Sequence, residues 1–135
     1  MPHAPSHPCV VLLHTLPDAS SHLDWFTARS PTPNTNPAAP LLAFRAALRP
    51  DDPTVRAFSA LSLPDHRAHY LTHEGPLEPK DGRDRGAVRR LAQGMAHIER
   101  ADPDAVVLVA QWGGAPRRYT GTPTETGWLF RVTAV

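Results

Sequence analysis

The sequence has little of several features that define common protein classes. It holds one cysteine among 135 residues, Cys9, so it excludes an internal disulfide and a zinc site built from cysteines. It holds no run of about 18 apolar residues, so no segment predicts a membrane-spanning helix. Its net charge is only +1, from 14 basic and 13 acidic residues, which excludes a surface that attracts polyanions over its whole area. With no secretion signal visible, we expect a soluble, cytoplasmic protein without a membrane partner.

Proline and histidine are the residues in which the chain is rich. Sixteen prolines argue against long helices and favour short strands joined by stiff loops, and a chain of this length fits one domain. The sequence therefore predicts an all-β fold, a compact β-barrel of about seven or eight short strands with one or two short helical turns. We expect the domain to span residues 9–135, preceded by a disordered segment at residues 1–8.

Apolar runs and alternation between turn signals predict the individual strands. The predicted strands are Cys9–Leu16, Leu23–Ala28, Leu41–Leu48, Val55–Leu63, Ala105–Trp112 and Thr126–Val135. Ser30–Pro40 holds four prolines and predicts a loop. Residues 66–73 predict a short helical segment. Ala87–Arg100 stays ambiguous, because its propensity favours a helix whereas Gly94 at its centre also suits a hairpin of two strands.

Three places combine titratable side chains with a defined local structure. The first is His14, late in the first strand, and the second is His22-Leu23-Asp24, where alternation puts His22 and Asp24 on one face of the next strand. The third is the segment Asp65-His66-Arg67-Ala68-His69-Tyr70. Two imidazoles and a carboxylate on one face suit a divalent metal, and a further histidine and Tyr70 could then contact a phosphate. The competing interpretation is chance clustering of solvated histidines in a chain that has eight. For His69 that surface role is the one expected.

Two motifs give the chain a resemblance to a known family. The first is VVLLHTLPDASSHLD at Val10–Asp24, and the second is LPDHRAHYLTHEG at Leu63–Gly75. A strand that ends in histidine, an H-x-D motif and a later D-H-x-x-x-Y-x-x-x-E-G motif resemble the 3′-phosphoesterase module of bacterial DNA ligase D. The resemblance spans most of residues 9–92 and is loose beyond them.

The resemblance implies a β-barrel that binds manganese, or another divalent transition metal, and trims the 3′ ends of nucleic acids. It implies removal of a terminal ribonucleoside and then of a 3′-phosphate. By motif, His14, Asp24 and His66 would be the metal ligands. The catalytic residues would be His22, which contacts the scissile phosphate, and Tyr70, which hydrogen-bonds a phosphate oxygen.

The chain departs from this family at positions that usually carry charge. Phe26 and Ala28 stand where the H-x-D motif normally continues with an arginine and an acid, and a further arginine position falls near Phe58. Other arginines nearby in the sequence could replace them. The substrate-binding residues that we predict on this basis are Arg56, Arg67 and Arg85, the last within a basic stretch at residues 83–90.

The sequence thus predicts a metal-dependent 3′-end-processing phosphoesterase, a hydrolase of DNA repair that acts on DNA or RNA–DNA ends. Its expected partners are nucleic-acid 3′ ends and a separate DNA ligase or polymerase, and we expect a monomer. Two alternatives remain open. One is a non-catalytic, metal-containing repair module that binds such ends, and the other is a phosphoesterase for a small phosphorylated substrate.

Overall fold

The computed structural model describes residues 5–32 and 40–135, so the predicted disorder at residues 1–4 and most of the predicted loop at 30–40 lie outside it. Within these residues the chain forms strands, all paired antiparallel, and one short 3-10 helix. The elements are β1 (His7–Thr15), β2 (Ser21–Ala28), β3 (Leu41–Ala46), β4 (Ala57–His66), η2 (Ala68–Leu71), β5 (Gly75–Pro76), β6 (Ala87–Asp102), β7 (Ala105–Gln111), β8 (Arg117–Pro123) and β9 (Trp128–Ala134).

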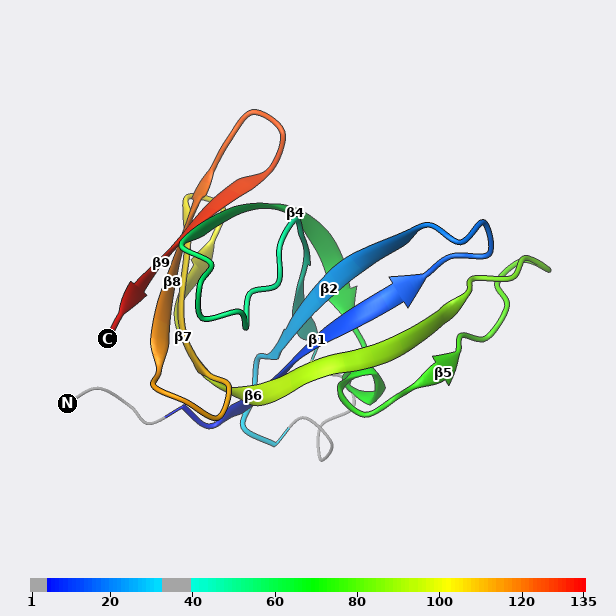
Figure 1. Cartoon of the computed structure of the whole chain (residues 1–135), viewed down its shortest axis with the longest axis horizontal. Coiled ribbons are helices and arrows are strands. Elements are labelled where there is room, and N and C mark those ends of the chain that lie inside the picture. The colour runs from blue at the N-terminus through cyan, green and yellow to red at the C-terminus, as the bar shows by residue number, and fades with distance from the viewer. Residues whose placement is uncertain (1–4, 33–39) are drawn as a thin grey trace.

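The strands curl into a closed ring (Figure 1). Their order is β1-β2-β3-β4-β9-β8-β7-β6, and a further pairing of β6 with β1 closes the sheet. The two-residue strand β5 adds to the edge of β6. The predicted all-β class is confirmed. In the described part of the chain, no helix has the length and apolar character needed to cross a membrane.

An aromatic cluster fills the inside of the ring. Trp25 lies at its centre, with ring centroids 5.2 Å from both Tyr119 and Phe130 and 5.8 Å from Phe58. All four rings are almost completely buried. Tilted and edge-to-face contacts of this kind stabilise a core beyond the burial of area alone. Phe58, at a position where the family resemblance suggests an arginine, is therefore part of the core.

A second cluster covers the outer face of β1–β3. Val10 and Leu12 of β1 and Phe26 of β2 pack there against Tyr70 and Leu71 of η2. Because β1 is covered on both faces, its sequence is a continuous apolar run rather than an alternating one. The 3-10 helix and the segments beside it thus form a lid over one part of the ring.

Three boundaries correct the sequence-based predictions. The first strand begins at His7, where His7 pairs with Ala96, so the predicted disordered segment extends two residues too far. The helical segment is a single turn, Ala68–Leu71, and His66 instead ends β4. Residues 87–102 form neither a helix nor a hairpin but the one long strand β6, which pairs with both β1 and β7.

Two glycines explain how β6 fits between its neighbours. At Gly94 a Cβ atom would lie 2.3 Å from the carbonyl oxygen of Gln111, so the glycine permits close backbone contact rather than a turn. At Gly86, just before β6, φ is +81° and a Cβ atom would lie 1.9 Å from the carbonyl oxygen of Thr15. Gly86 therefore sets how closely the start of β6 approaches the end of β1.

Substitution of Gly86 tests this close approach. Gly82 provides a matched control, because its φ is also positive (+73°) but no atom lies within 4 Å of a Cβ built there. We expect Gly82→Ala to lower the free energy of unfolding by about 1 kcal/mol, from backbone strain alone. Gly86→Ala should lower it by at least about 2 kcal/mol more, because the added methyl meets backbone. Urea denaturation measures both, and equal losses would contradict the account.

Candidate metal centre

Strand register brings four polar side chains to one face of the sheet. The β1–β2 pairing sets His14 directly opposite His22, and the β2–β3 pairing sets Asp24 opposite Arg45. His22 and Asp24 are two residues apart on β2, so both point to the same face. This outer face is the one that η2 covers farther along the strands. The cluster therefore follows from three neighbouring strands and needs no loop to assemble it.

Three of these side chains form a compact group of donor atoms. His14 Nδ1 lies 3.0 Å from His22 Nε2, His22 Nε2 lies 3.5 Å from Asp24 Oδ1, and His14 Nδ1 lies 3.8 Å from Asp24 Oδ2. One ligand atom from each residue lies within 4.8 Å of the other two. Ligand atoms about 2.1 Å from one ion are separated by about 3.0–3.4 Å in octahedral or tetrahedral sites. The His14–His22 separation lies in this range, and the two separations to Asp24 exceed it by a few tenths of an ångström, so a shared ion would draw the carboxylate inward.

Hydrogen bonds orient lone pairs toward the centre of the group. His14 Nε2 donates to the carbonyl oxygen of Arg85 at 2.7 Å, so in the neutral ring Nδ1 carries the lone pair. Metal-ligating histidines typically donate their second N–H to a carbonyl in this way. Arg45 Nη2 donates to His22 Nε2 at 3.2 Å, so this nitrogen also presents a lone pair. The lone pair of His22 Nε2 is engaged by Arg45, so a cation at this nitrogen would displace that hydrogen bond, whereas the lone pair of His14 Nδ1 faces the group directly.

The carboxylate of Asp24 reinforces this preference for a cation. Asp24 is only 6% exposed, and its Oδ1 is buried without a hydrogen-bond partner among the described residues. Burial raises the pKa of Asp24, and the nearby His14, Arg45 and His66 oppose that rise. A buried carboxylate oxygen without a partner is costly unless a cation compensates it. The donor set, two imidazoles and one carboxylate, suits a divalent transition metal.

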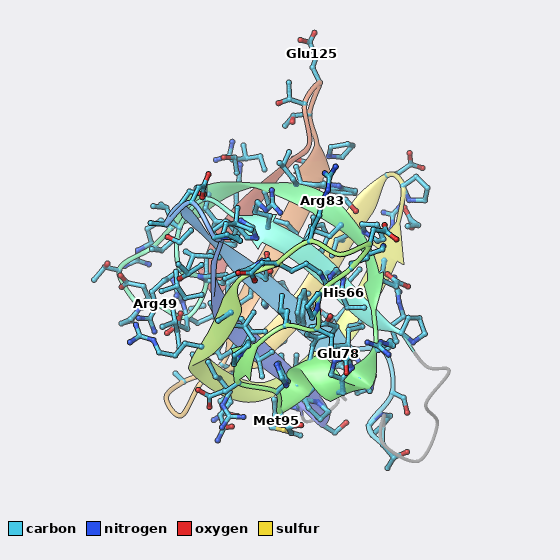
Figure 2. The ribbon with its side chains drawn as sticks, turned by 90° about the vertical axis from the view of Figure 1, so that its right-hand side faces the viewer. Arg49, His66, Glu78, Arg83, Met95 and Glu125 are labelled. Carbon is cyan, nitrogen blue, oxygen red and sulfur yellow. The ribbon has the colours of Figure 1, made fainter. Side chains whose placement is uncertain are left out.

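A pocket of 450 Å³ opens over the group. Its opposite wall carries His66, Arg67 and Tyr70. His66 stacks on Phe26 with a centroid distance of 4.6 Å, and its Nδ1 donates to the carbonyl oxygen of Pro64 at 2.7 Å. Its Nε2 therefore carries the lone pair of the neutral ring. Figure 2 looks onto this end of the molecule, with His66 near the middle of the view.

The structure gathers most of the predicted site residues at this pocket. His14, His22 and Asp24 form the donor group, and His66, Tyr70 and Arg67 line the same pocket, although His66 is not part of the compact group. Arg85 adjoins it, because its carbonyl oxygen bonds His14 and its Nη2 donates to the Tyr70 hydroxyl at 3.5 Å.

The prediction for Arg56 is wrong as to place. Arg56 precedes β4, where its carbonyl oxygen accepts a hydrogen bond from Val132, whereas His66 ends the same strand. A ten-residue strand spans about 30 Å, so Arg56 lies far from the pocket.

The cationic residue that sequence reasoning missed is Arg45. The sequence singles out Arg45 as the only charged residue in the apolar run 41–48, but it does not show that Arg45 lies opposite Asp24.

A larger pocket of 540 Å³ adjoins the first and shares His22 and Arg45 with it. Leu23 and Trp128 form part of its apolar lining, and both also pack against the inner core. The hydroxyl-bearing residues in its wall are Ser21, Ser59, Thr124 and Thr126. The pocket lies beside the β8–β9 hairpin, whose tip at Glu125 projects from the molecule (Figure 2).

Comparison with family models and with curated proteins found no match to this chain. The structure itself defines an all-β protein with a half-buried His–His–Asp group beneath an open pocket. Such a group can bind a divalent cation and hold an anionic ligand against it, because Arg45, Arg67 and Tyr70 offer hydrogen-bond donors in the same pocket. Asp65 also lines the pocket, and its carboxylate is paired with Arg29.

Manganese binding provides the first test of the group. A ligand that binds only the folded state at a hundredfold excess over its Kd stabilises that state by about 2.7 kcal/mol. We expect millimolar manganese to raise the Tm of the protein, and Asp24→Asn to remove the rise. Asp104→Asn, an exposed substitution with the same change in charge, should retain it. An undiminished rise in Asp24→Asn would contradict the assignment of the site.

The pH dependence of stability tests the environment of His22. Burial first, and then the positive charges of Arg45 and His14, lower the pKa of His22 from 6.5 to about 4. Between these values the unfolded chain binds a proton at His22 and the folded protein does not, so stability falls as the pH falls. In metal-free protein, the loss of unfolding free energy between about pH 6.5 and about pH 4 should be smaller in His22→Gln than in wild type. Parallel curves of unfolding free energy against pH for the two proteins would contradict a lowered pKa at His22.

Proposed function

We propose that the protein is a metal-dependent phosphoesterase that acts on the 3′ ends of nucleic acids. The observation that carries the proposal is the convergence of His14 Nδ1, His22 Nε2 and Asp24 Oδ1, three electron-rich atoms beneath a pocket lined by arginines. Manganese or a similar divalent ion fits this donor set. When bound, such an ion polarises a phosphoryl oxygen and lowers the pKa of a coordinated water.

The other side chains of the pocket suit a phosphate. In the proposal Arg45 and Arg67 contact non-bridging phosphate oxygens, since a guanidinium group offers several donors in a plane. Tyr70 adds a neutral hydroxyl donor, and the hydrogen bond from Arg85 orients that hydroxyl. Arg45 and Tyr70 already have partners within the site, so they can offset negative charge that develops on phosphate with little rearrangement, whereas the exposed side chain of Arg67 has to be ordered by the substrate.

The proposed roles of His22 and His66 are exchanged relative to those that the family resemblance implies. The 3.0 Å contact between His14 and His22 favours His22 as the third ligand. His66 then faces the phosphate from the opposite wall, where stacking on Phe26 holds its ring in place. The assignment of the two histidines is therefore a separate and testable part of the proposal.

Two alanine variants separate these roles. We expect His22→Ala to weaken manganese binding by about tenfold or more in calorimetric titration, because one of three ligands is lost. His66→Ala should bind manganese with nearly unchanged affinity while its turnover falls by about a hundredfold, in line with the loss of a group that contacts the reacting phosphate. If His66→Ala instead loses manganese affinity and His22→Ala keeps it, the ligand set that the resemblance implies is the correct one.

The proposed substrate class rests on the two motifs and on the pocket of 540 Å³. This volume accommodates a nucleoside, and pockets for such ligands are mostly apolar with a few polar groups. Trp128 supplies an aromatic face of the kind on which nucleobases stack, and the hydroxyls supply donors and acceptors for base and sugar edges. The terminal ribonucleoside that is removed would lie there beside His22 and Arg45, on the 3′ side of the scissile phosphate.

The direct test is turnover of a defined nucleic-acid end. A labelled primer–template ending in a 3′-phosphate, or in a single 3′-ribonucleotide, is incubated with protein and manganese. We expect conversion to a 3′-hydroxyl end, abolished by a chelator and by Asp24→Asn and reduced in Tyr70→Phe, which removes one donor and leaves the donor group intact. The same variants acting on an internal phosphodiester serve as a control for contaminating nuclease.

A non-catalytic end-binding module is the second candidate, and Phe26 favours it. Where the family resemblance expects an arginine, Phe26 is 1% exposed and packs on His66 and Tyr70, so no cation reaches the pocket from that position. Manganese-dependent binding of 3′-phosphorylated ends without any conversion of them would support this candidate over the enzyme.

A further inference from the structure

A third pocket, separate from the two described above, lies beside η2. Its volume is 460 Å³, and it lies between the 3-10 helix and the segment that follows β5. Glu78 in this segment lies below His66 in Figure 2. The basic residues that line it are Arg67, His69, His73, Lys80 and Arg85. Glu78 is the one acidic residue of that lining among the described residues, so the pocket has an excess of positive charge.

Two of the cations are available to a ligand. Neither the guanidinium group of Arg67 nor the ammonium group of Lys80 takes part in a hydrogen bond or ion pair within the residues that the structure describes. Arg85 is tied in place instead, by hydrogen bonds to the carbonyl oxygen of Glu78 and to the Tyr70 hydroxyl. Burial, and then the charges of Arg67 and His73, lower the pKa of His69, and the carboxylate of Glu78 opposes this shift.

The basic pocket adjoins the metal pocket. Arg67 and Tyr70 line both of them. Arg85 contacts both sites, because its carbonyl oxygen accepts a hydrogen bond from His14 Nε2 and Arg85 itself lines the basic pocket. A phosphate at the donor group would thus have a second anion site as its direct neighbour.

We propose that this basic pocket binds the next phosphate of a polynucleotide strand whose 3′-terminal phosphate lies at the donor group. The inference rests on the proposed function and narrows its substrate class to a strand, as opposed to a small monophosphate. Lys80 and Arg67 provide the charge, and Tyr70 and Arg85 separate the two phosphate positions. Because the contact is to the backbone, it carries no preference for sequence.

Lys80 is the residue on which to test the inference. It is the only lysine of the chain, and its side chain is exposed. It lines the basic pocket and not the metal pocket. Arg131 is exposed on β9, and its side chain has no hydrogen-bond or ion-pair partner among the described residues, so it gives a matched control. Lys80→Ala and Arg131→Ala change the net charge equally, and Lys80→Glu strengthens the first change if alanine has too small an effect.

The measurement compares two probes in the presence of manganese, thymidine 3′-monophosphate and thymidine 3′,5′-bisphosphate. We expect wild type and Arg131→Ala to prefer the bisphosphate by about fivefold or more, and Lys80→Ala to lose most of this preference. Lys80→Glu should lose it completely, and all four proteins should bind the monophosphate alike. For a single-stranded oligonucleotide ending in a 3′-phosphate, Lys80→Ala should reduce the slope of log K against log salt by about 0.7.

The outcomes separate this inference from the proposed function. Equal binding of the two probes by wild type, with turnover of 3′-phosphorylated ends intact, overturns the second phosphate site and leaves the phosphoesterase standing. An unchanged preference in Lys80→Glu overturns it as well. If wild type binds neither probe with manganese present, both the inference and the proposed function are wrong.

Discussion

The pairing of β1 with a strand on each side is the constraint on which the rest of the structure depends. Its contact with β2 begins the ring of strands, and its contact with β6 closes it. Burial of both faces of β1 then joins the inner core to the cluster beneath η2. The same two pairings position His14, which lies opposite His22 on β2 and bonds the carbonyl oxygen of Arg85 just before β6. Fold and donor group thus share one strand.

The donor group is a place where the fold accepts a local cost. Among the residues that the structure describes, neither the buried Oδ1 of Asp24 nor the buried Nε of Arg45 on the neighbouring strand has a hydrogen-bond partner. Uncompensated buried polar groups are rare in folded proteins and cluster where ligands bind. In the proposed function, a cation at His14, His22 and Asp24 would compensate the carboxylate, and an anion above it would pair with the guanidinium group of Arg45. Metal and phosphate binding would then offset each other's electrostatic costs within one site.

The sequence predicted the parts of the site that depend on strand alternation. His22 and Asp24 share a face because they are two residues apart on β2, and His14 joins them because the β1–β2 turn sets it opposite His22. Arg45 was missed because its neighbour Asp24 lies on another strand, and pairing between strands is not visible in a single sequence. Arg56 was misplaced for the complementary reason: residues ten apart are close in the chain but lie at opposite ends of an extended strand.

The fold shows the same division between local and non-local information. The all-β class followed from short apolar runs between prolines, and most strands were predicted within a few residues. The strand β6 was not, because Gly94 looks like a turn residue and functions instead as the point where the backbone of β7 approaches closely. The strand β8 lies in a segment, residues 117–123, that has no clear pattern of its own and is held by β7 and β9 on either side.

The claim on which the account rests is that His14 and His22 place their ring nitrogens on a single divalent ion. Pulsed electron paramagnetic resonance of the manganese complex tests this directly, since it detects nitrogen nuclei bound to the ion. The account predicts coupling to imidazole nitrogen that weakens in His22→Ala and is unchanged in His66→Ala. A manganese spectrum without nitrogen coupling, at concentrations where wild-type protein is saturated, would contradict it.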